Sequence, residues 1–486
     1  MFNRAQSYLR SLLGPQADFR RDQWRTLEAI VEQQRRVLLV QRHGWGKNLV
    51  ALLAVKLRRF AKAGPALWIA SRRSRVREEI RQASRLGLQF ANLYEKNRDE
   101  WPRVVHGLER DAFDLLLISP ELLGHEPFRE TIWPLIRARL GLVVIDDAHL
   151  LADESGGFRP DYRRIGKWLR DCPPDVPLLA TTSAVNRQMV GEIGTVLGSA
   201  PLLIRGPLVR TTIRLQNLCI PDPAGRLAWL GRNLHLFPGS GLIACLTVAD
   251  TERVAAGLNR QGLNVQAYHG GLKADERTAL EMALRHNEVK ALAATTALDS
   301  GFNKPDLGFV IHFQMPGSLA TYYQQVGRAG RAIDKSYGIL LAGEEDRSIH
   351  EHFIAHAFPP MDVATRLLRN LDKTGKQTFD ELSASLKIPG DDLERVLKFL
   401  HVEEAIAVST ADAEPRYERT AWEWKPDYNR IQETIRRRRD ELTQMGEYLD
   451  QRGCLMEFLA RALDDPEAHP CGVCANCQGR GFKVEG

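Results

Sequence analysis

The sequence predicts an α/β protein with two doubly wound parallel-sheet lobes, followed by a winged-helix-like domain and a zinc-binding helical module. Three observations support this fold class. Short apolar segments alternate with amphipathic stretches as far as residue 345, this alternation occurs in two sets, and cysteines cluster near the C-terminus. Parallel strands have such continuous apolar segments because helices cover both faces of their sheet.

The apolar segments give the expected strands of the two lobes. In the first lobe they are residues 36–41, 66–71, 114–119, 141–146 and 177–182. In the second lobe they are residues 241–246, 264–270, 291–296, 308–313 and 337–343. Residues 198–212, which contain Gly and Pro, are expected to form the linker between the lobes. The predicted domains are residues 1–207, 208–352, 353–425 and 426–486.

A different pattern begins after residue 352. Three short helical patterns are followed by a segment that alternates like a two-stranded hairpin around an Ala-Glu-Pro turn; the four segments are residues 363–371, 378–386, 391–406 and 407–424. Three helices and a hairpin predict a winged helix. Residues 427–450 are expected to form a long polar helix that ends just before the cysteines.

Composition favours a basic, cytoplasmic protein. The net charge is +6 and the pI is about 8.9, which mildly favours a polyanionic partner. No apolar run approaches the ~20 residues that span a bilayer, and the arginine-containing N-terminus lacks an apolar signal core, so we expect no membrane association. Cys172, Cys219 and Cys245 are isolated and expected to be buried thiols.

A phosphate-binding loop is predicted between the first strand and the next helix. Gly44 and Gly46 allow tight turns that aim backbone N–H groups at phosphate oxygens, and Lys47 would reach the terminal phosphates of ATP. A lone Gly-x-Gly-Lys is equally compatible with an incidental glycine turn, but its position after a buried strand favours the phosphate loop. Asn48 occupies the position where such loops carry the Ser or Thr that holds Mg²⁺.

Two further elements complete a predicted ATP-hydrolysing site. In "VVIDDAHLL" (143–151), Asp146 would hold Mg²⁺ through water, and Asp147 would orient or deprotonate the attacking water. A solvated acidic strand end is the alternative. In "YYQQVGRAGR" (322–331), Arg328 and Arg331 would reach a γ-phosphate from the second lobe, whereas a basic helix face is the alternative.

The C-terminal cysteines predict a zinc site. Their spacing, sixteen, two and two residues, can offer four thiolates to one tetrahedral Zn²⁺; they are Cys454, Cys471, Cys474 and Cys477. The alternatives are an iron–sulfur cluster and independent thiols. Because four protein ligands fill all coordination positions of the metal, the metal is expected to stabilise the fold of the segment rather than to catalyse a reaction.

The ordered motifs resemble those of the RecQ family of superfamily 2 helicases over nearly the whole chain. They include "FRRDQ" (19–23), "LLLISPELL" (115–123), "GFRPDYRRI" (157–165), "AYHGGL" (267–272) and "GFNKPDLGFVIHF" (301–313). The resemblance implies RecA-like lobes and an ATP-dependent DNA helicase or translocase moving 3′ to 5′. It also implies single-stranded and forked DNA as partners, a role in repair or recombination, and a monomer.

The resemblance also implies roles for single residues. Phe19, Arg20 and Gln23 would contact the base of ATP, while Phe158 and Arg159 would contact DNA from an aromatic-rich loop. His149 and Gln324 would join the catalytic group. The winged helix precedes the cysteines, as in the bacterial RecQ-like H subgroup, and no phosphoribosyltransferase-like domain of that subgroup is found in this sequence.

The sequence departs from the family pattern near the metal and the attacking water. Asn48 replaces Ser or Thr, and Asp147 replaces Glu; outside this pair, Ser183 and the Asp299-Ser300 pair are also unusual. Two interpretations therefore stay open: a slow but genuine motor, or an ATP- and DNA-binding pseudo-helicase scaffold with little or no hydrolysis. RNA remodelling is a third class, against which the winged helix and the cysteines argue.

Overall fold

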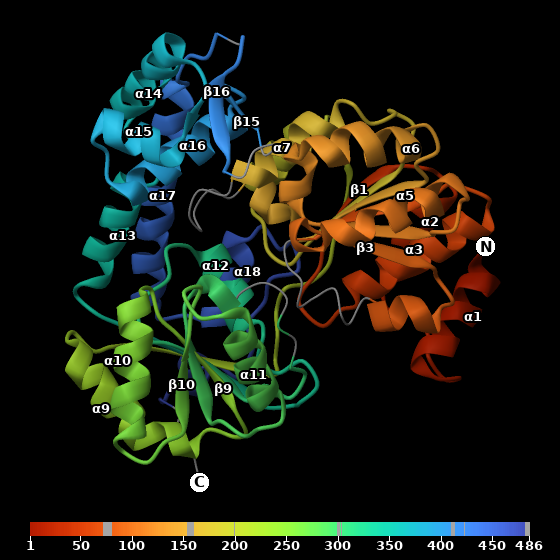
Figure 1. Ribbon diagram of the computed structural model, residues 1–486. Coiled ribbons are helices and arrows are strands. Elements are labelled where there is room, and N and C mark those ends of the chain that lie inside the picture. The colour runs from red at the N-terminus through yellow and green to blue at the C-terminus, as the bar shows by residue number, and fades with distance from the viewer. Residues whose placement is uncertain are drawn as a thin grey trace.

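The computed structural model contains two α/β lobes, a winged helix and a C-terminal helical segment (Figure 1). The structure describes residues 1–70, 80–152, 160–198, 200–298, 302, 304–409, 414–421 and 423–481. Lobe 1, red to yellow in Figure 1, lies beside lobe 2, which is green, and the winged helix stands next to both. Among these residues, no helix is both long enough and apolar enough to cross a membrane.

Lobe 1 is built on a seven-stranded parallel sheet with the order β3-β4-β2-β5-β6-β1-β7. Its strands are β1 (Arg36–Val40), β2 (Ala66–Ile69), β3 (Phe90–Leu93), β4 (Leu115–Ile118), β5 (Leu142–Ile145), β6 (Leu178–Thr182) and β7 (Leu202–Arg205). Its helices are α1 (Phe2–Leu13), α2 (Gln23–Val31), α3 (Lys47–Phe60), α5 (Trp101–Glu109), α6 (Trp133–Arg137), α7 (Pro160–Leu169) and α8 (Arg187–Val196). The five strands expected here are confirmed.

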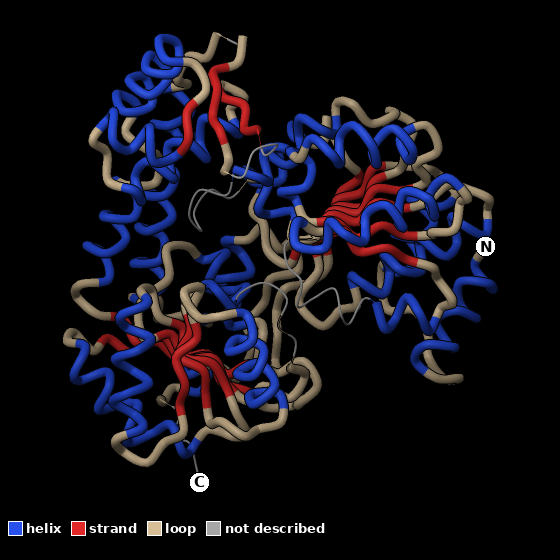
Figure 2. Tube along the Cα trace, in the orientation of Figure 1, coloured by secondary structure: helices blue, strands red, loops and turns tan. Residues whose placement is uncertain are grey.

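Both faces of this sheet are buried, as its apolar strands require. In β1, Leu38 and Val40 belong to the apolar cluster on one face, whereas Val37 and Leu39 belong to the cluster on the other. Figure 2 shows helices covering the sheet. The linker prediction was wrong in one respect: residues 202–205 form β7, an edge strand paired only with β1. The Gly and Pro residues on both sides of this short apolar run had favoured a linker.

Lobe 2 repeats this architecture with a six-stranded parallel sheet of order β10-β11-β9-β12-β13-β8. Its strands are β8 (Ile213–Cys219), β9 (Gly241–Ala244), β10 (Val265–Tyr268), β11 (Ala291–Ala294), β12 (Phe309–His312) and β13 (Ser336–Ala342). Its helices are α9 (Pro223–Asn233), α10 (Val248–Asn259), α11 (Ala274–Arg285), α12 (Leu319–Val326) and α13 (Asp346–Ala355). The five expected strands are confirmed, and β8 adds an edge strand, at whose end Cys219 is exposed rather than buried.

The next segment has the topology of a winged helix with its own apolar cluster. Its elements are α14 (Met361–Thr374), β14 (Gln377–Thr378), α15 (Phe379–Leu386), α16 (Gly390–Val402), β15 (Ile406–Ser409) and β16 (Arg416–Arg419). The strand β14 completes a three-stranded antiparallel sheet with the expected hairpin. This domain contacts lobe 1, because Lys167 on α7 donates to the carbonyl of Val402 and pairs with Glu404.

Three C-terminal helices finish the described chain: α17 (Tyr428–Leu449), α18 (Leu455–Ala462) and α19 (Ala475–Gln478). They share one apolar cluster with lobe 2, in which Leu455 and Met456 join Leu215 and Leu340. The long helix α17 also reaches lobe 1, where Nη1 of Arg437 donates to both carboxylate oxygens of Glu192 at 2.7 Å. The C-terminal segment therefore bridges the two lobes.

Candidate nucleotide site and metal centre

The predicted phosphate loop connects β1 to α3. Gly44 and Gly46 have φ values of 77° and 106°, in the left-handed region that favours glycine. A Cβ on Gly46 would also lie 2.9 Å from Nε2 of Gln23, so the loop has no room for a side chain there. Because α3 begins at Lys47, its first N–H groups and its dipole face the loop, as an anion site requires.

Lys47 folds over this loop. Its Nζ donates to the carbonyl of Gln41 at 2.6 Å and to that of Arg42 at 3.3 Å. The ammonium thus lies against the residues that lead from β1 into the turn. Asn48 is the second residue of α3 and offers an amide oxygen, a donor type that Mg²⁺ accepts.

The predicted base-recognition motif is held against the phosphate loop. Gln23 is 3% exposed, accepts a hydrogen bond from the backbone N–H of Arg20, and donates through Nε2 to the carbonyl of Trp45. The guanidinium of Arg20 donates to the carbonyl of Gly44 at 2.6 Å. Phe19 lies half-buried in an aromatic cluster beside them. The motif and the loop therefore form one hydrogen-bonded unit.

The acidic motif follows β5 at the same sheet edge, since the order β5-β6-β1 places β6 between the two loops. Asp146 is 2% exposed and accepts hydrogen bonds from the Thr181 hydroxyl at 2.7 Å and from the N–H of Asp147 at 2.9 Å. His149 is buried and lies 3.3 Å, through Nδ1, from the Thr182 hydroxyl. The end of β6 thus fixes both motif residues.

Those two threonines contact the acidic motif and were missed by the sequence analysis. The segment "ATTSA" drew attention only to Ser183, whereas the structure gives the contacts to Thr181 and Thr182. The available signal was a strand that ends in hydroxyl side chains beside an acidic strand end. Parallel neighbours place such side chains at one edge.

Lobe 2 meets the phosphate loop through the segment after α12. A Cβ built on Gly44 would lie 3.7 Å from Cβ of Arg331, and one on Gly327 would lie 3.1 Å from Cδ2 of His43. The segment 327–331, here called the arginine loop, therefore packs directly on the phosphate loop. Of the two predicted arginine fingers, Arg331 is the one that this contact places beside the phosphate loop.

The other residues of this motif hold positions inside lobe 2. Arg328 is 7% exposed and donates to the carbonyl of Leu298 at 2.9 Å. Gln324 is half-buried on α12, while its neighbour Gln325 is buried and bonds to Nε2 of His312 at 2.8 Å. Of the predicted residues, Arg331 therefore lies at the interface between the lobes, Arg328 lies inside lobe 2, and Gln324 lies half-buried on α12.

Arg210, in the segment between the lobes, is a third residue that the sequence analysis missed. Its guanidinium is 4% exposed and donates to the carbonyls of Gly327, Ala329 and Gly330 at 2.7, 2.9 and 2.5 Å. Burial lowers the pKa of Arg210 to about 10, so the side chain stays charged near neutral pH. One buried cation therefore ties the arginine loop to the connection between the lobes.

The same connection is anchored to the C-terminal segment. The backbone N–H of Leu208 donates to Asp465 at 2.7 Å, and its carbonyl accepts from the Tyr323 hydroxyl at 2.6 Å. Asp465 lies between the first and second cysteines of the predicted metal site. The metal module, α12 and the interlobe connection are thus joined by buried hydrogen bonds.

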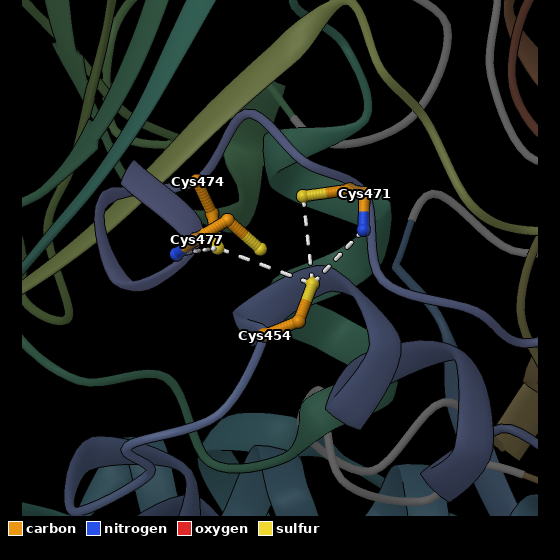
Figure 3. A group of neighbouring side chains, drawn as sticks. All are labelled: Cys454, Cys471, Cys474 and Cys477. Carbon is orange, nitrogen blue, oxygen red and sulfur yellow. Dashed lines mark hydrogen bonds between the residues drawn. The ribbon is translucent and has the colours of Figure 1, made fainter. Parts of the chain in front are cut away.

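The four C-terminal cysteines converge in space (Figure 3). The Sγ of Cys454 lies 3.5 Å from that of Cys471 and 3.9 Å from that of Cys474, and the four sulfur atoms all lie within 4.8 Å of one another. Tetrahedral Zn²⁺ with Zn–S bonds of ~2.3 Å requires sulfur atoms roughly 3.8 Å apart, so these residues fit the metal. Cys477 completes the set.

The clustered thiols share their protons, whereas the isolated cysteines do not. Hydrogen bonding within the cluster lowers the pKa of Cys474 and raises the pKa of Cys471, so one thiolate is favoured and a bound metal would displace the remaining protons. Burial raises the pKa of the isolated Cys172 to about 12, so that thiol stays protonated. The predicted DNA contacts Phe158 and Arg159, and the unusual pair at 299–300, lie outside the described residues.

Comparisons with known proteins agree with this geometry. Residues 20–192 match the DEAD/DEAH box helicase family, and residues 226–333 match the helicase conserved C-terminal domain. By structure, the chain is similar to the DUF1998 helicase MrfA bound to DNA, with a TM-score of 0.59 and 17% identity over 88% of this chain and 63% of that one. It is also similar to Saccharomyces cerevisiae Dbp5 bound to RNA and ADP BeF3, with a TM-score of 0.54 and 20% identity over 68% and 87%. These two likenesses concern the fold alone.

Curated relatives are more specific. The chain is 28% identical to the ATP-dependent DNA helicase RecQ of Synechocystis sp. over 94% of its own length and 95% of the relative. It is 29% identical to RecQ of Pasteurella multocida over 66% of this chain and half of that protein, and 26% identical to the probable helicase RecS of Bacillus subtilis over 73% and 70%. With the motifs in order and both helicase domains matched, the chain resembles the RecQ helicases over nearly its whole length.

Proposed function

We propose that the protein is an ATP-dependent DNA helicase that binds Mg²⁺-ATP between its lobes. The observation that carries this proposal is the packing of the arginine loop of lobe 2 on the phosphate loop of lobe 1. A γ-phosphate held at that junction would touch groups from both lobes. Hydrolysis would then be coupled to a change in their relative position.

Each predicted site residue has a role in this scheme. Lys47 would neutralise the terminal phosphates, Asp146 and Asn48 would hold Mg²⁺, and Asp147 would direct the attacking water. The remaining catalytic group consists of His149, Gln324, Arg328 and Arg331. Phe19, Arg20 and Gln23 would recognise the base, with Gly44 and Gly46 shaping the phosphate turn. Zn²⁺ on the four cysteines would supply folding energy rather than reaction chemistry.

The nucleic-acid partner we propose is single-stranded or forked DNA, along which a monomer moves 3′ to 5′ in repair or recombination in the cytoplasm. The net charge of +6 and the winged helix support a DNA partner. Phe158 and Arg159 would couple the strand to hydrolysis. Phosphate contacts would make binding salt-dependent and largely sequence-independent. The order of winged helix and cysteines supports membership of the RecQ-like H subgroup.

The alternative function is an ATP- and DNA-binding scaffold that hydrolyses ATP too slowly to move. Asp147 and Asn48 favour it, because they replace the usual Glu and Ser or Thr of the family. The missing methylene withdraws the Asp147 carboxylate by ~1 Å, and misplacement of that size costs roughly 10²-fold in rate. We favour the motor because the lysine and both arginines are retained.

Steady-state ATP turnover with Mg²⁺, with and without single-stranded DNA, tests the proposal. We expect DNA to stimulate turnover and Lys47→Ala to abolish the stimulated rate, since the lysine neutralises the phosphates. An RNA strand of equal length should stimulate less. Turnover that Lys47→Ala leaves unchanged would contradict the assignment, and stronger stimulation by RNA would favour RNA remodelling.

A restored active site separates the motor from the scaffold. If the two unusual residues limit the rate, the double variant Asn48→Ser, Asp147→Glu should raise turnover by roughly 10²-fold, the cost of a misplaced carboxylate. DNA affinity, measured in parallel, should stay unchanged. An equally slow double variant would show that neither residue limits hydrolysis.

A further inference from the structure

A cavity of about 540 Å³ lies where lobe 2, α13, the winged-helix helix α16 and α17 meet. Its volume falls within the ~300–1,000 Å³ typical of ligand sites. The carboxyl ends of β9 and β12 contribute to its lining, through Ala244 and His312. None of the residues assigned above to ATP, DNA or the metal lines this cavity. It therefore requires its own explanation.

The charged lining favours an anion. The lining holds three cations, Arg395 and Lys398 on α16 and Arg438 on α17, against one carboxylate, that of Glu441. Outside the lining, Arg395 also pairs with Asp392 at 2.6 Å. Arg395 and Lys398 have side chains that are 45% and 54% exposed, so solvent reaches them. Nζ of Lys398 lies 3.6 Å from the carboxylate of Asp161 on α7. This ion pair is long and partly exposed, so a phosphate can replace the carboxylate.

One wall of the cavity is aromatic and exposed. On α13, Phe353 is 43% exposed, and the rings of His352 and His356 lie beside each other with 4.1 Å between their centroids. An exposed phenylalanine next to a pair of imidazoles tilted by 34° is a surface on which a nucleobase can stack. Such stacking tolerates any base, because every base has a π face.

The buried residue His312 adds a polar contact. Its Nε2 bonds to Oε1 of Gln325 at 2.8 Å and is the donor in that pair, which leaves Nδ1 as an acceptor. Nδ1 is buried and has no hydrogen-bond partner among the described residues. Burial lowers the pKa of His312 to about 4, so the ring is neutral at physiological pH. An N–H donor of a ligand would satisfy this nitrogen.

We propose that this cavity holds one unstacked nucleotide of the DNA strand, with its phosphate near Arg395 and Lys398 and its base against Phe353. The inference rests on the proposed function, because the strand is the one that the helicase binds. Lobe 2 and the winged helix would then both contact the same strand where the two domains meet. A base in single-stranded DNA is free to enter, since no pairing has to be broken.

Equilibrium binding of the full chain to a fluorescein-labelled oligothymidylate, without ATP, tests the cavity. Phe353→Ala should weaken binding roughly ten-fold, the usual loss for one stacking platform. Lys398→Gln should weaken it less and lower the dependence on salt. The matched controls are Phe60→Ala, at an exposed phenylalanine of lobe 1, and Lys425→Gln, at an exposed lysine; both should bind like the wild type.

Two further measurements distinguish the sources of the nucleotide. An oligonucleotide carrying 5-iodouracil should crosslink to the peptide of α13 on irradiation, and Phe353→Ala should remove that crosslink. Binding of free dTMP that is lost in Phe353→Ala, with oligonucleotide affinity unchanged, would overturn the strand assignment. Unchanged oligonucleotide binding in both cavity variants, together with no crosslink to α13, would also overturn it.

These outcomes are separable from the failure of the proposed function. If the wild type binds the oligonucleotide and the cavity variants bind it equally well, only the cavity assignment fails. If the wild type binds no oligonucleotide, the DNA partner itself is wrong, and the cavity assignment falls with it. Binding is measured without ATP, so a slow or absent ATPase does not affect the result.

Discussion

The two lobes hold their parts of the nucleotide site in different ways. In lobe 1, the acidic motif is fixed by the neighbouring strand of the same sheet, where Thr181 bonds Asp146 at 2.7 Å and Thr182 contacts His149. In lobe 2, the arginine loop lies beyond the end of α12, and three of its carbonyls are held by Arg210 from the interlobe connection.

This difference separates binding from turnover. The groups expected to bind ATP and Mg²⁺ are held by contacts within lobe 1, so we expect them to keep their geometry when lobe 2 moves. Arg331 lies against the phosphate loop, and Arg210 of the interlobe connection holds the arginine loop that carries it. We therefore expect substitutions in lobe 1 to change nucleotide affinity and substitutions around the arginine loop to change the catalytic rate.

The largest expected effect is on Arg331, which lies against the phosphate loop. Arg331→Ala should lower the DNA-stimulated kcat by ~10³-fold, as the loss of an arginine finger does, with ATP affinity within a few-fold of wild type. Steady-state kinetics and fluorescent-nucleotide binding measure the two quantities. Arg347→Ala, at an exposed arginine of lobe 2, serves as the control. A loss of ATP affinity as large as the loss of kcat would contradict the assignment of binding to lobe 1 and of turnover to the arginine loop of lobe 2.

A smaller effect is expected at Arg210, which we infer to be a positioning residue. Arg210→Met should lower kcat by roughly 10²-fold, because the arginine loop loses the cation that orients it, while ATP affinity changes little. Arg210→Lys should recover only part of the rate, since one ammonium cannot replace a planar guanidinium fork that spans three carbonyls.

The control for Arg210 is thermal unfolding of the same variants. Removing the guanidinium leaves buried carbonyls unpaired, at a cost of ~1–3 kcal/mol in stability, and both variants should show it. If kcat fell only in proportion to the folded fraction, Arg210 would be structural and not a positioning residue. Partial recovery of kcat by lysine at equal stability supports positioning.

Sequence reasoning succeeded where the signal is local. The phosphate loop is a glycine turn between a buried strand and a helix, and the acidic motif is a strand end, so neighbours in sequence predicted both positions. Arg210 gave no such signal, because its partners lie 117 to 120 residues away. The edge strand β7 was missed for another reason: its apolar run Leu202-Leu203-Ile204 is short and lies between Pro201 and the pair Gly206-Pro207, which favoured a linker.

The smallest expected effect is a pH dependence that belongs to lobe 2 alone. His312 bonds to Gln325 and so anchors α12, which carries the arginine loop. Burial lowers the pKa of His312 from its ordinary 6.5 to about 4. Between these values the unfolded chain takes up a proton that the folded chain does not, so stability is kept above pH 6.5 and is lost as the pH falls toward 4.

At about pH 5 this linkage lowers the free energy of unfolding by on the order of 2 kcal/mol. His312→Gln keeps a donor for Gln325 but does not titrate, so its thermal midpoint should fall less than that of the wild type between about pH 7 and pH 5. His401→Gln is the matched control, since burial also lowers the pKa of His401 to about 4, but in the winged helix. Only His312→Gln should also preserve kcat in acid, because only His312 supports the helix before the arginine loop. Equal protection of kcat by both variants would mean that acid destabilises the whole fold rather than the anchoring of α12 and the arginine loop.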